Sequence, residues 1–383
     1  MTLPVRPLTL AMVAGETSGD LLASMLIEGL KSRWHDSRFV GIGGPRMENL
    51  GFSSWWPMNK LSVRGYVEVL RHYREILDIR RKLKGRLIET PPDIFIGVDA
   101  PDFNLELSRQ LKQIGIPSIQ FVCPSVWAWR ANRLDKIRLS TDHVLCLFPF
   151  EPALLNAHGI DATYVGHPLA QVIPDVVDKN AARAKLGISP SELVLAVLPG
   201  SRVSEIEQLT IKFLQAAELL SKNHSSLKVL LPVAPGLESR IRRLTGRFAN
   251  SIQLILIDGQ SHDVLAAADL ALVASGTATL EAALFKCPMV IAYSMPWISW
   301  QLMQRQRLQP WVGLPNILCG EFVVPELLQS QANPSALATA LESWLDDPNK
   351  IGYMREKFQT MHSILRKDTI VLATDAIEKI LAR

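Results

Sequence analysis

The sequence contains no long hydrophobic run, because no window reaches the ~18 unbroken apolar residues that a membrane-spanning helix requires. The first apolar run, at residues 8–14, is short and lacks the cationic region, longer apolar core and cleavage site of a signal peptide. We therefore interpret it as a buried strand. We expect a cytoplasmic protein whose membrane contact, if any, is peripheral.

Cysteine is scarce, and its four occurrences show no metal-type spacing. Each lies in an apolar or loop context: Cys123, Cys146, Cys287 and Cys319. This pattern is typical of buried free thiols in a reducing compartment.

Two phosphate-binding signatures are missing. Without the Walker pattern GxxxxGK followed by Ser or Thr, and without GxGxxG, neither an NTPase nor a dinucleotide dehydrogenase is the first choice. The net charge of +4 is too small to indicate nucleic-acid binding by itself. A hydrophobic content of 48% argues against disorder, and 383 residues suit two domains better than one.

What the sequence does contain is an alternation of short apolar runs and helical patterns, the latter including 20–32 and 103–114. Strands are predicted at 8–14, 39–43, 93–99, 118–123, 143–148 and 163–166, and again at 193–199, 227–233, 253–258, 270–274 and 288–293. Continuous apolar strands separated by helices indicate parallel sheets covered on both faces. The fold class is therefore α/β, with two similar domains facing a cleft and ligands at the carboxyl ends of the strands.

The link between the domains is placed at 166–187, which contains two prolines and no predicted strand. The expected domains are 1–168 and 169–345. After about residue 330 the pattern is entirely helical.

The stretch VASGTATLEAAL (273–284) joins a strand to a helix through Ser275, Gly276 and Thr277. Free N–H groups and the positive end of the helix dipole stabilise an anion such as a diphosphate. Glu281, one turn further on, is suited to accept hydrogen bonds from two ribose hydroxyls. The alternative is an ordinary helix cap formed by Ser275 or Thr277.

The stretch LPGSRVSEIEQL (198–209) is a second such junction, with Gly200, Ser201 and Arg202. Arginine suits phosphate because its planar fork donates two parallel hydrogen bonds. The alternative is a surface arginine, which the helix dipole mildly opposes, and that mismatch favours a bound anion. Two strand-to-helix junctions suited to anions in one domain indicate a binding site for a nucleotide diphosphate.

In the first half, MVAGETSGDLL (12–22) carries Glu16, Ser18 and Asp20 in a turn between strand and helix. A turn rich in carboxylates suits hydroxyls better than phosphate. Asp20 is also a natural candidate for a purely structural cap.

The stretch GVDAPDFNLEL (97–107) places Asp99 where a strand ends, followed by Asp102 and Asn104. A carboxylate there can remove the proton of an attacking hydroxyl. The alternative role, capping the next helix, suits Asp102 better than Asp99. We therefore favour Asp99 as a catalytic base.

Aromatic side chains gather in CPSVWAWRANR (123–133), where Trp127 can stack on a sugar or anchor at a lipid interface. Core packing is at least as common for such a tryptophan. His167 lies near the link, where a histidine is more often structural than catalytic.

Residues 64–86 form a basic amphipathic pattern, with eight Lys or Arg against three acids. Its predicted membrane-facing residues are Val67, Val69, Leu70, Tyr73, Ile76 and Leu77. Such a helix either packs on a core or lies on an anionic membrane.

Taken together, the motifs VAGETSGD, GVDAPDFN, PSVWAWR, LPGSR, ASGTATLE, CPMVIAY and LPNIL occur in the order and spacing of lipid-A-disaccharide synthases. The resemblance runs from near residue 8 to the C-terminal helices. It implies an inverting glycosyltransferase of the GT-B type, with two Rossmann-like domains. The implied reaction joins UDP-2,3-diacylglucosamine to 2,3-diacylglucosamine 1-phosphate, giving a β-1,6-linked tetraacyl disaccharide 1-phosphate and UDP.

The resemblance also implies roles for the residues above. Asp99, or alternatively Glu16, takes the proton of the acceptor 6-hydroxyl. Arg202, with the amides from Ser275 to Thr277, stabilises the diphosphate in place of a metal, so that no cofactor is expected. The remaining expected contacts are Gly200, Ser201, Glu281 and Asn316 for the donor, and Gly15, Ser18, Asn104 and Trp127 for the acceptor or sugar.

The resemblance further implies that helices within 346–383 return to the first domain, and that the enzyme works on the inner face of the cytoplasmic membrane. A homodimer that exchanges C-terminal segments is left open, and nucleic acid is not an expected partner. The rival functions are another GT-B enzyme acting on a UDP-amino sugar, of the peptidoglycan transferase or 2-epimerase type, and a non-catalytic nucleotide-sugar sensor.

Overall fold

The computed structural model describes residues 7–61, 66–128 and 133–383, without the side chains of 66–73, 298, 299 and 302. The chain divides into two compact units. Unit 1 contains the chain up to Pro168 together with Leu365–Arg383, and unit 2 is the continuous stretch Leu169–Ile364.

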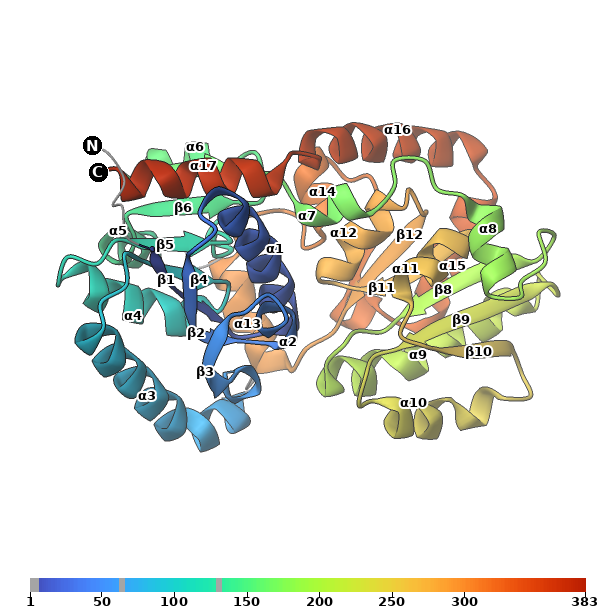
Figure 1. Ribbon diagram of the computed structural model, residues 1–383. Helices are drawn as coiled ribbons and strands as arrows, with labels where there is room; N and C mark the ends of the chain where they lie inside the picture. The colour runs from blue at the N-terminus through green and yellow to red at the C-terminus, as the bar shows by residue number, and fades with distance from the viewer. Residues whose placement is uncertain (1–6, 62–65, 129–132) are drawn as a thin grey trace. The chain divides into compact units, whose positions relative to one another are not determined.

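Unit 1 is built on a seven-stranded parallel sheet in the order β3-β2-β1-β4-β5-β6-β7 (Figure 1). In that order the strands are Ser53–Pro57, Arg38–Gly43, Thr9–Ala14, Ile94–Val98, Ser118–Phe121, His143–Cys146 and Ala162–Tyr164. The order reverses between β1 and β4, and this reversal marks the place where open α/β sheets bind ligands.

Both faces of this sheet are covered. The helices are α1 (Thr17–Arg33), α2 (Pro45–Glu48), α3 (Tyr66–Glu89), α4 (Pro101–Lys112), α5 (Arg133–Ser140), α6 (Glu151–Asn156) and α17 (Thr369–Leu381), with a 3₁₀ turn at Met58–Lys60. Because side chains alternate along a strand, Met12 of β1 enters the core under α1 and α17, whereas Val13 enters the core under α3 and α4. Because both faces of the sheet are buried, the strands consist of unbroken runs of apolar residues in the sequence.

Unit 2 repeats the design with a six-stranded parallel sheet in the order β10-β9-β8-β11-β12-β13. In that order the strands are Gln253–Asp258, Leu227–Val233, Leu193–Leu198, Leu270–Ala274, Met289–Tyr293 and Glu326–Leu328. The reversal here lies between β8 and β11.

The helices of unit 2 are α7 (Pro168–Val172), α8 (Lys179–Lys185), α9 (Val203–Ser221), α10 (Glu238–Thr245), α11 (Ser261–Ala267), α12 (Thr277–Leu284), α13 (Trp297–Gln306), α14 (Leu314–Cys319), α15 (Pro334–Leu345) and α16 (Pro348–Leu365), with 3₁₀ turns at Gly246–Phe248 and Gln329–Gln331. Helix α9 buries Leu209, Phe213 and Leu220 at helical spacing and packs beside α15. The buried Trp344 of α15 donates its indole N–H to the carbonyl of Met289, which ties this helix to β12.

The predicted α/β fold with two Rossmann-like parallel-sheet domains is confirmed, and each of the eleven predicted strands is present. The prediction missed β3 and β13. Both are edge strands that pair with a single neighbour, and neither has a buried apolar run.

The C-terminal helices differ from the expectation that residues 346–383 as a whole pack on the first domain. Helix α17 belongs to unit 1 and lies beside α1, but α16 belongs to unit 2. The buried side chains of α16 include Met354, Phe358 and His362, and His362 contacts Lys286 and Ala170 of its own unit.

A search of the described residues for a helix long and apolar enough to cross a bilayer finds none.

Candidate active site

The reversal point of unit 1 brings together two turns that are far apart in the sequence. Strands β1 and β4 are neighbours, with Ala14 opposite Val98. Gly15 and Glu16 follow β1, and Asp99 follows β4, so the three residues lie at the same carboxyl edge. The carboxylates predicted as alternative bases therefore stand on adjacent strands.

The turn that carries Asp99 is strained. Asp99 and Ala100 have φ angles of 52° and 41°, which are left-handed values for two consecutive residues that are not glycine. Such conformations cost about 1–3 kcal/mol each and persist only where the surrounding structure imposes them. Asp99 itself is partly exposed.

The expected capping role of Asp102 is wrong. Helix α4 begins after Ala100, and no side chain caps it. The exposed Asp102 instead forms an ion pair with Arg133, with 2.7 Å between Oδ1 and Nη2. Trp129 and Arg130, from the same aromatic stretch as Arg133, lie outside the described residues.

Asn104 was expected to contact the acceptor, and this expectation is wrong. The residue is completely buried in α4, and its Nδ2 lies 2.8 Å from the carbonyl oxygen of Asp99. It serves the backbone of the turn and has no surface to offer a ligand.

The carboxylate-rich turn after β1 divides into two kinds of residue. Glu16 is partly exposed and stands at the N-terminus of α1 without capping it, and Ser18 is exposed in the first turn. Asp20 is only 2% exposed and accepts hydrogen bonds from the backbone N–H groups of Gly44, Arg46 and Met47. Asp20 is therefore structural, as its alternative interpretation held, but the helix it caps is α2.

Trp127 is not an open platform for a sugar. It is 7% exposed and packs edge-on against Phe148 and Phe150, and its indole N–H donates to Oε1 of Glu151 at 2.9 Å. Burial raises the pKa of Glu151 to about 7, although the bonds from Trp127 and from the backbone N–H of Phe148 act in the opposite direction. The core-packing interpretation holds for this tryptophan.

The reversal point of unit 2 likewise brings its two glycine turns together. Strands β8 and β11 are neighbours, with Val273 opposite Leu198. Gly276 is the exposed N-cap of α12, and no side chain caps this helix. The alternative in which Ser275 or Thr277 caps the helix is therefore wrong, and the helix start keeps its N–H groups directed outward from the sheet edge.

Arg202 already has an anionic partner within the chain. Oε1 of Glu205 lies 2.9 Å from its guanidinium, and Oε2 accepts from the backbone N–H groups of Ser201 and Arg202 at 3.3 Å each. Glu205, in the first turn of α9, thus makes the half of a capping box in which an acidic side chain accepts from the N-cap backbone N–H. The mismatch between Arg202 and the helix dipole therefore no longer favours a bound anion, because Glu205 already supplies a negative charge.

Glu281 has a neighbour that the sequence did not indicate. Nε2 of His262, in α11, lies 3.8 Å from Oε2 of Glu281, and the ring of His262 meets Phe285 edge-on. The neighbouring Glu281 carboxylate raises the pKa of His262. No spacing rule links the two positions, because the contact arises from the packing of α11 beside α12.

Asn316 was expected at the donor site, but its amide is fully buried and fully used. Nδ2 donates to the carbonyl of Val324 and to Glu326, and Oδ1 accepts from the N–H groups of Val323 and Val324. The residue ties α14 to the strand that follows it, so the expectation of a direct contact is wrong.

The C-terminal half of the basic helix α3 packs on the core of unit 1. Ile79, Leu83 and Leu87 are buried there, and Ile76 packs partly against the same cluster. The membrane-facing assignment of Ile76 is therefore wrong, whereas Leu77 is partly exposed. The other predicted membrane-facing side chains lie outside the described ones: Val67, Val69, Leu70 and Tyr73.

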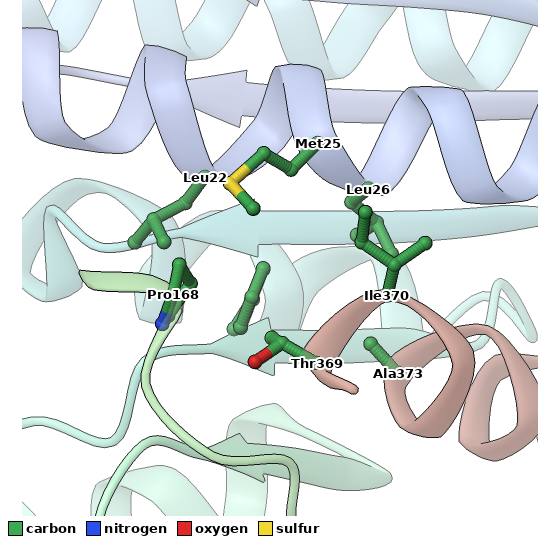
Figure 2. Close-up of a pocket in the computed structure, with 8 residues that line it drawn as sticks. Leu22, Met25, Leu26, Pro168, Thr369, Ile370 and Ala373 are labelled. Carbon is green, nitrogen blue, oxygen red and sulfur yellow. The ribbon is translucent and has the colours of Figure 1, made fainter. Parts of the chain in front are cut away.

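Neither of two hollows in the structure coincides with these turns. A small apolar pocket of about 10 Å³ lies between α1 and α17, and its lining includes Leu22, Met25 and Leu26 of α1 and Ile370 and Ala373 of α17 (Figure 2). An open groove of about 410 Å³ in unit 2 is bordered by His262, Phe285 and Ala182. Among the described residues, no group of three or more His, Cys, Asp or Glu side chains is placed to hold a metal ion.

Comparison with known proteins identifies the family. The model of the lipid-A-disaccharide synthetase family matches residues 10–380. The lipid-A-disaccharide synthase of Albidiferax ferrireducens is 57% identical over 98% of this chain and 97% of its own, and that of Paraburkholderia xenovorans is 49% identical over 100% and 99%. The chain belongs to the lipid-A-disaccharide synthase family. It is a glycosyltransferase of lipid A biosynthesis.

Solved structures show that this synthase shares its fold with enzymes of other sequence families. A putative UDP-N-acetylglucosamine 2-epimerase from Listeria monocytogenes has a TM-score of 0.65 at 11% identity, covering 98% of this chain and 96% of its own. MurG of Acinetobacter baumannii has a TM-score of 0.58 at 13% identity, covering 98% and 100%. These neighbours are GT-B proteins, so the predicted GT-B fold of the synthase is confirmed.

Proposed function

We propose that this synthase transfers the sugar of UDP-2,3-diacylglucosamine to the 6-hydroxyl of 2,3-diacylglucosamine 1-phosphate, with inversion at the anomeric carbon. The products are the β-1,6-linked tetraacyl disaccharide 1-phosphate and UDP. Unit 1 binds the acceptor and unit 2 binds the donor. The observation that carries this division is that a carboxylate ends β4 in unit 1, whereas an uncapped helix start follows β11 in unit 2.

In this proposal Asp99 is the general base. Its carboxylate accepts the proton of the acceptor 6-hydroxyl while that oxygen bonds to the anomeric carbon and the bond from this carbon to the diphosphate breaks. The strained turn at the edge of the sheet supports the role, because a base must keep one geometry relative to the hydroxyl. Glu16, on the neighbouring strand end, is the second candidate.

The leaving UDP carries the charge that unit 2 stabilises. The exposed start of α12 at Gly276 directs backbone N–H groups and the positive end of the helix dipole at the diphosphate. Glu281 accepts from the ribose hydroxyls. Arg202 reaches the diphosphate by turning away from Glu205, since half of its side chain is exposed.

The acyl chains of both substrates call for contact with the cytoplasmic membrane. Helix α3 is the proposed contact, with Val67, Val69, Leu70 and Tyr73 as the apolar residues of its N-terminal part. The stretch 64–86 carries five more basic than acidic side chains, and this excess lies within 80–86.

The test is transfer by the purified protein, with disaccharide formation and UDP release both measured. We expect Asp99→Asn to lower kcat by about 10³-fold, within the range that general bases contribute, while UDP binding by calorimetry stays unchanged. Glu16→Gln is the matched variant on the adjacent strand end. Normal turnover by Asp99→Asn together with loss by Glu16→Gln would move the base role to Glu16. Binding of UDP without any product from the wild-type protein would contradict the proposed reaction.

A further inference from the structure

The strained turn at Asp99 and Ala100 is held by two buried amides. Nδ2 of Asn104 lies 2.8 Å from the carbonyl oxygen of Asp99, and Nε2 of Gln120 lies 3.0 Å from the same oxygen. Asn104 comes from α4 and Gln120 from β5, and both residues are completely buried. Two separate elements therefore converge on one carbonyl group.

The same amides reach the neighbouring strand ends. Asn104 also donates weakly to the carbonyls of Val13 and Val98, and Gln120 to those of Phe121 and Val122. The amides thereby join the carboxyl ends of β1, β4 and β5 at the reversal point. The position of Asp99 relative to these three strands depends on both of them.

A contribution to folding stability does not by itself explain why two amide side chains are buried at these positions. Oδ1 of Asn104 and Oε1 of Gln120 are buried and have no hydrogen-bond partner within the described part of the chain. A buried polar atom without a partner is unfavourable, and apolar side chains of the same shape are often as stable. What the amides add is the pair of bonds to Asp99 at 2.8 and 3.0 Å, besides the longer bonds to the neighbouring strand ends.

The sheet is shaped to accept the pair. Gly97 lies in β4 beneath both amides, and a Cβ atom on it would be 2.7 Å from Cβ of Asn104 and 3.0 Å from Oε1 of Gln120. Both contacts are tighter than side chains normally allow. The absence of a side chain at Gly97 thus makes room for the two amides directly behind the Asp99–Ala100 turn.

We propose that Asn104 and Gln120 are positioning residues for sugar transfer, which hold the Asp99–Ala100 turn in its left-handed conformation and so fix where the Asp99 carboxylate points. The inference rests on the proposed role of Asp99 as the base. A carbonyl held from two sides fixes the plane of the Asp99–Ala100 peptide, and with it the direction of the Asp99 side chain. When one amide is lost the other still holds the carbonyl, and when both are lost the turn relaxes.

The test uses apolar replacements of similar shape, Asn104→Leu and Gln120→Met, singly and together. Each single variant is expected to lower kcat about 10-fold and the double variant more than 100-fold, because a displacement of about 1 Å at a reacting group costs on the order of 10²-fold. The Kd for UDP and the midpoint of thermal unfolding should stay close to those of the wild type. Ser108→Ala is the matched control, since Ser108 is buried one turn further along α4 and its hydroxyl has no hydrogen-bond partner among the described residues, and it should leave kcat unchanged.

A second measurement separates positioning from a structural role. The same replacements are made in the Asp99→Asn protein, where they should cause no further loss, because a residue that acts through the Asp99 carboxylate has nothing left to position. An equal loss in both backgrounds, or a kcat that falls only in step with the unfolding midpoint, would overturn the inference while leaving the base role intact. Full activity of Asp99→Asn alone would overturn both.

Discussion

The turn after β4 in unit 1 and the turn after β11 in unit 2 occupy equivalent places, because each follows the strand at which its sheet order reverses. They are built in opposite ways. Asp99 is held in a strained conformation by amides from two neighbouring elements, whereas Gly276 is exposed, uncapped and has open space around its Cα. One topology thus provides a fixed carboxylate in one unit and an open, electropositive helix start in the other.

The difference fits the chemistry that we propose for each turn. A base that removes a proton gains from a single geometry, so strain there is tolerated. A diphosphate brings its own charges and flexible oxygens, so the protein needs only to leave N–H groups accessible. Substitutions in unit 1 should therefore lower kcat, and substitutions in unit 2 should weaken donor binding.

Among single substitutions away from the two candidate bases, the largest effect is expected for Gly97→Ala. The new methyl group displaces Asn104 and Gln120 together, so kcat should fall by about 10²-fold with the Kd for UDP unchanged. Steady-state kinetics and calorimetry measure the two quantities. Gly85→Ala is the matched control, because a methyl group there meets nothing and alanine favours a helix by up to about 1 kcal/mol. A rise in the Kd for UDP with normal kcat would break the contrast between the units.

The counterpart in unit 2 is Glu281→Gln. Loss of hydrogen bonds to a charged acceptor, worth about 1.5 kcal/mol, should weaken UDP binding roughly 10-fold with little change of kcat at saturating donor. Titration calorimetry with UDP and with uracil checks whether the ribose is required. Glu342→Gln, on α15 and paired with His224, serves as the control. Unchanged UDP affinity would remove Glu281 from the donor site.

A smaller effect of opposite sign is expected for Glu205→Gln. Removing this carboxylate frees Arg202 and ends a like-charge repulsion with the diphosphate, so UDP should bind about 3-fold to 10-fold more tightly. The unfolding free energy should fall by about 0.5–1 kcal/mol, because the backbone N–H groups of Ser201 and Arg202 lose the charged acceptor at the start of α9. Weaker UDP binding would instead mean that Glu205 orients Arg202 for the ligand.

The smallest effect concerns the pH dependence of stability at His262. The folded-state pKa of this histidine is raised by Glu281, so its stabilising contribution is complete below the unfolded pKa of about 6.5 and is lost as the pH rises through the raised folded value. The pair is partly exposed, which limits the contribution to a few tenths of a kcal/mol. Urea unfolding of wild type and His262→Gln should differ most near pH 5 and converge by pH 8. A gap that widens with rising pH would contradict this assignment.

The sequence predicted the strands of the sheet interiors and placed Asp99 at a strand end, because both depend on local runs of apolar residues. It did not predict that Asp99 stands beside Glu16, since that proximity comes from β4 inserting next to β1. Asn104 and Asn316 were assigned to ligands because an amide in a motif looks the same whether it faces a cavity or a backbone carbonyl. Only packing decides between the two, and here it buries both.

The sequence analysis also did not predict the ion-pair partners of Arg202 and Glu281. Glu205 lies one helical turn from Arg202, so the ion pair was open to prediction from spacing, whereas His262 reaches Glu281 through helix packing. The same types of charged side chain bind ligands and form ion pairs within the protein, so the residue type alone does not separate the two roles. The sequence motifs therefore predicted where the two proposed ligand-binding edges of the sheets lie. They were less accurate in predicting which individual residues face a ligand.

The return of α17 to unit 1 has a consequence for synthesis on the ribosome. Ala373, Ile377 and Ile380 belong to the same core cluster as Leu10 and Met12. The helix also fits so closely against α1 that a side chain on Gly29 would collide with Ile370. Unit 1 therefore cannot close its core until α17, which follows unit 2 in the sequence, has been synthesised, whereas unit 2 is continuous and can fold beforehand. During that interval the apolar side chains that α17 covers stay exposed, so unit 1 is open to aggregation for longer than unit 2.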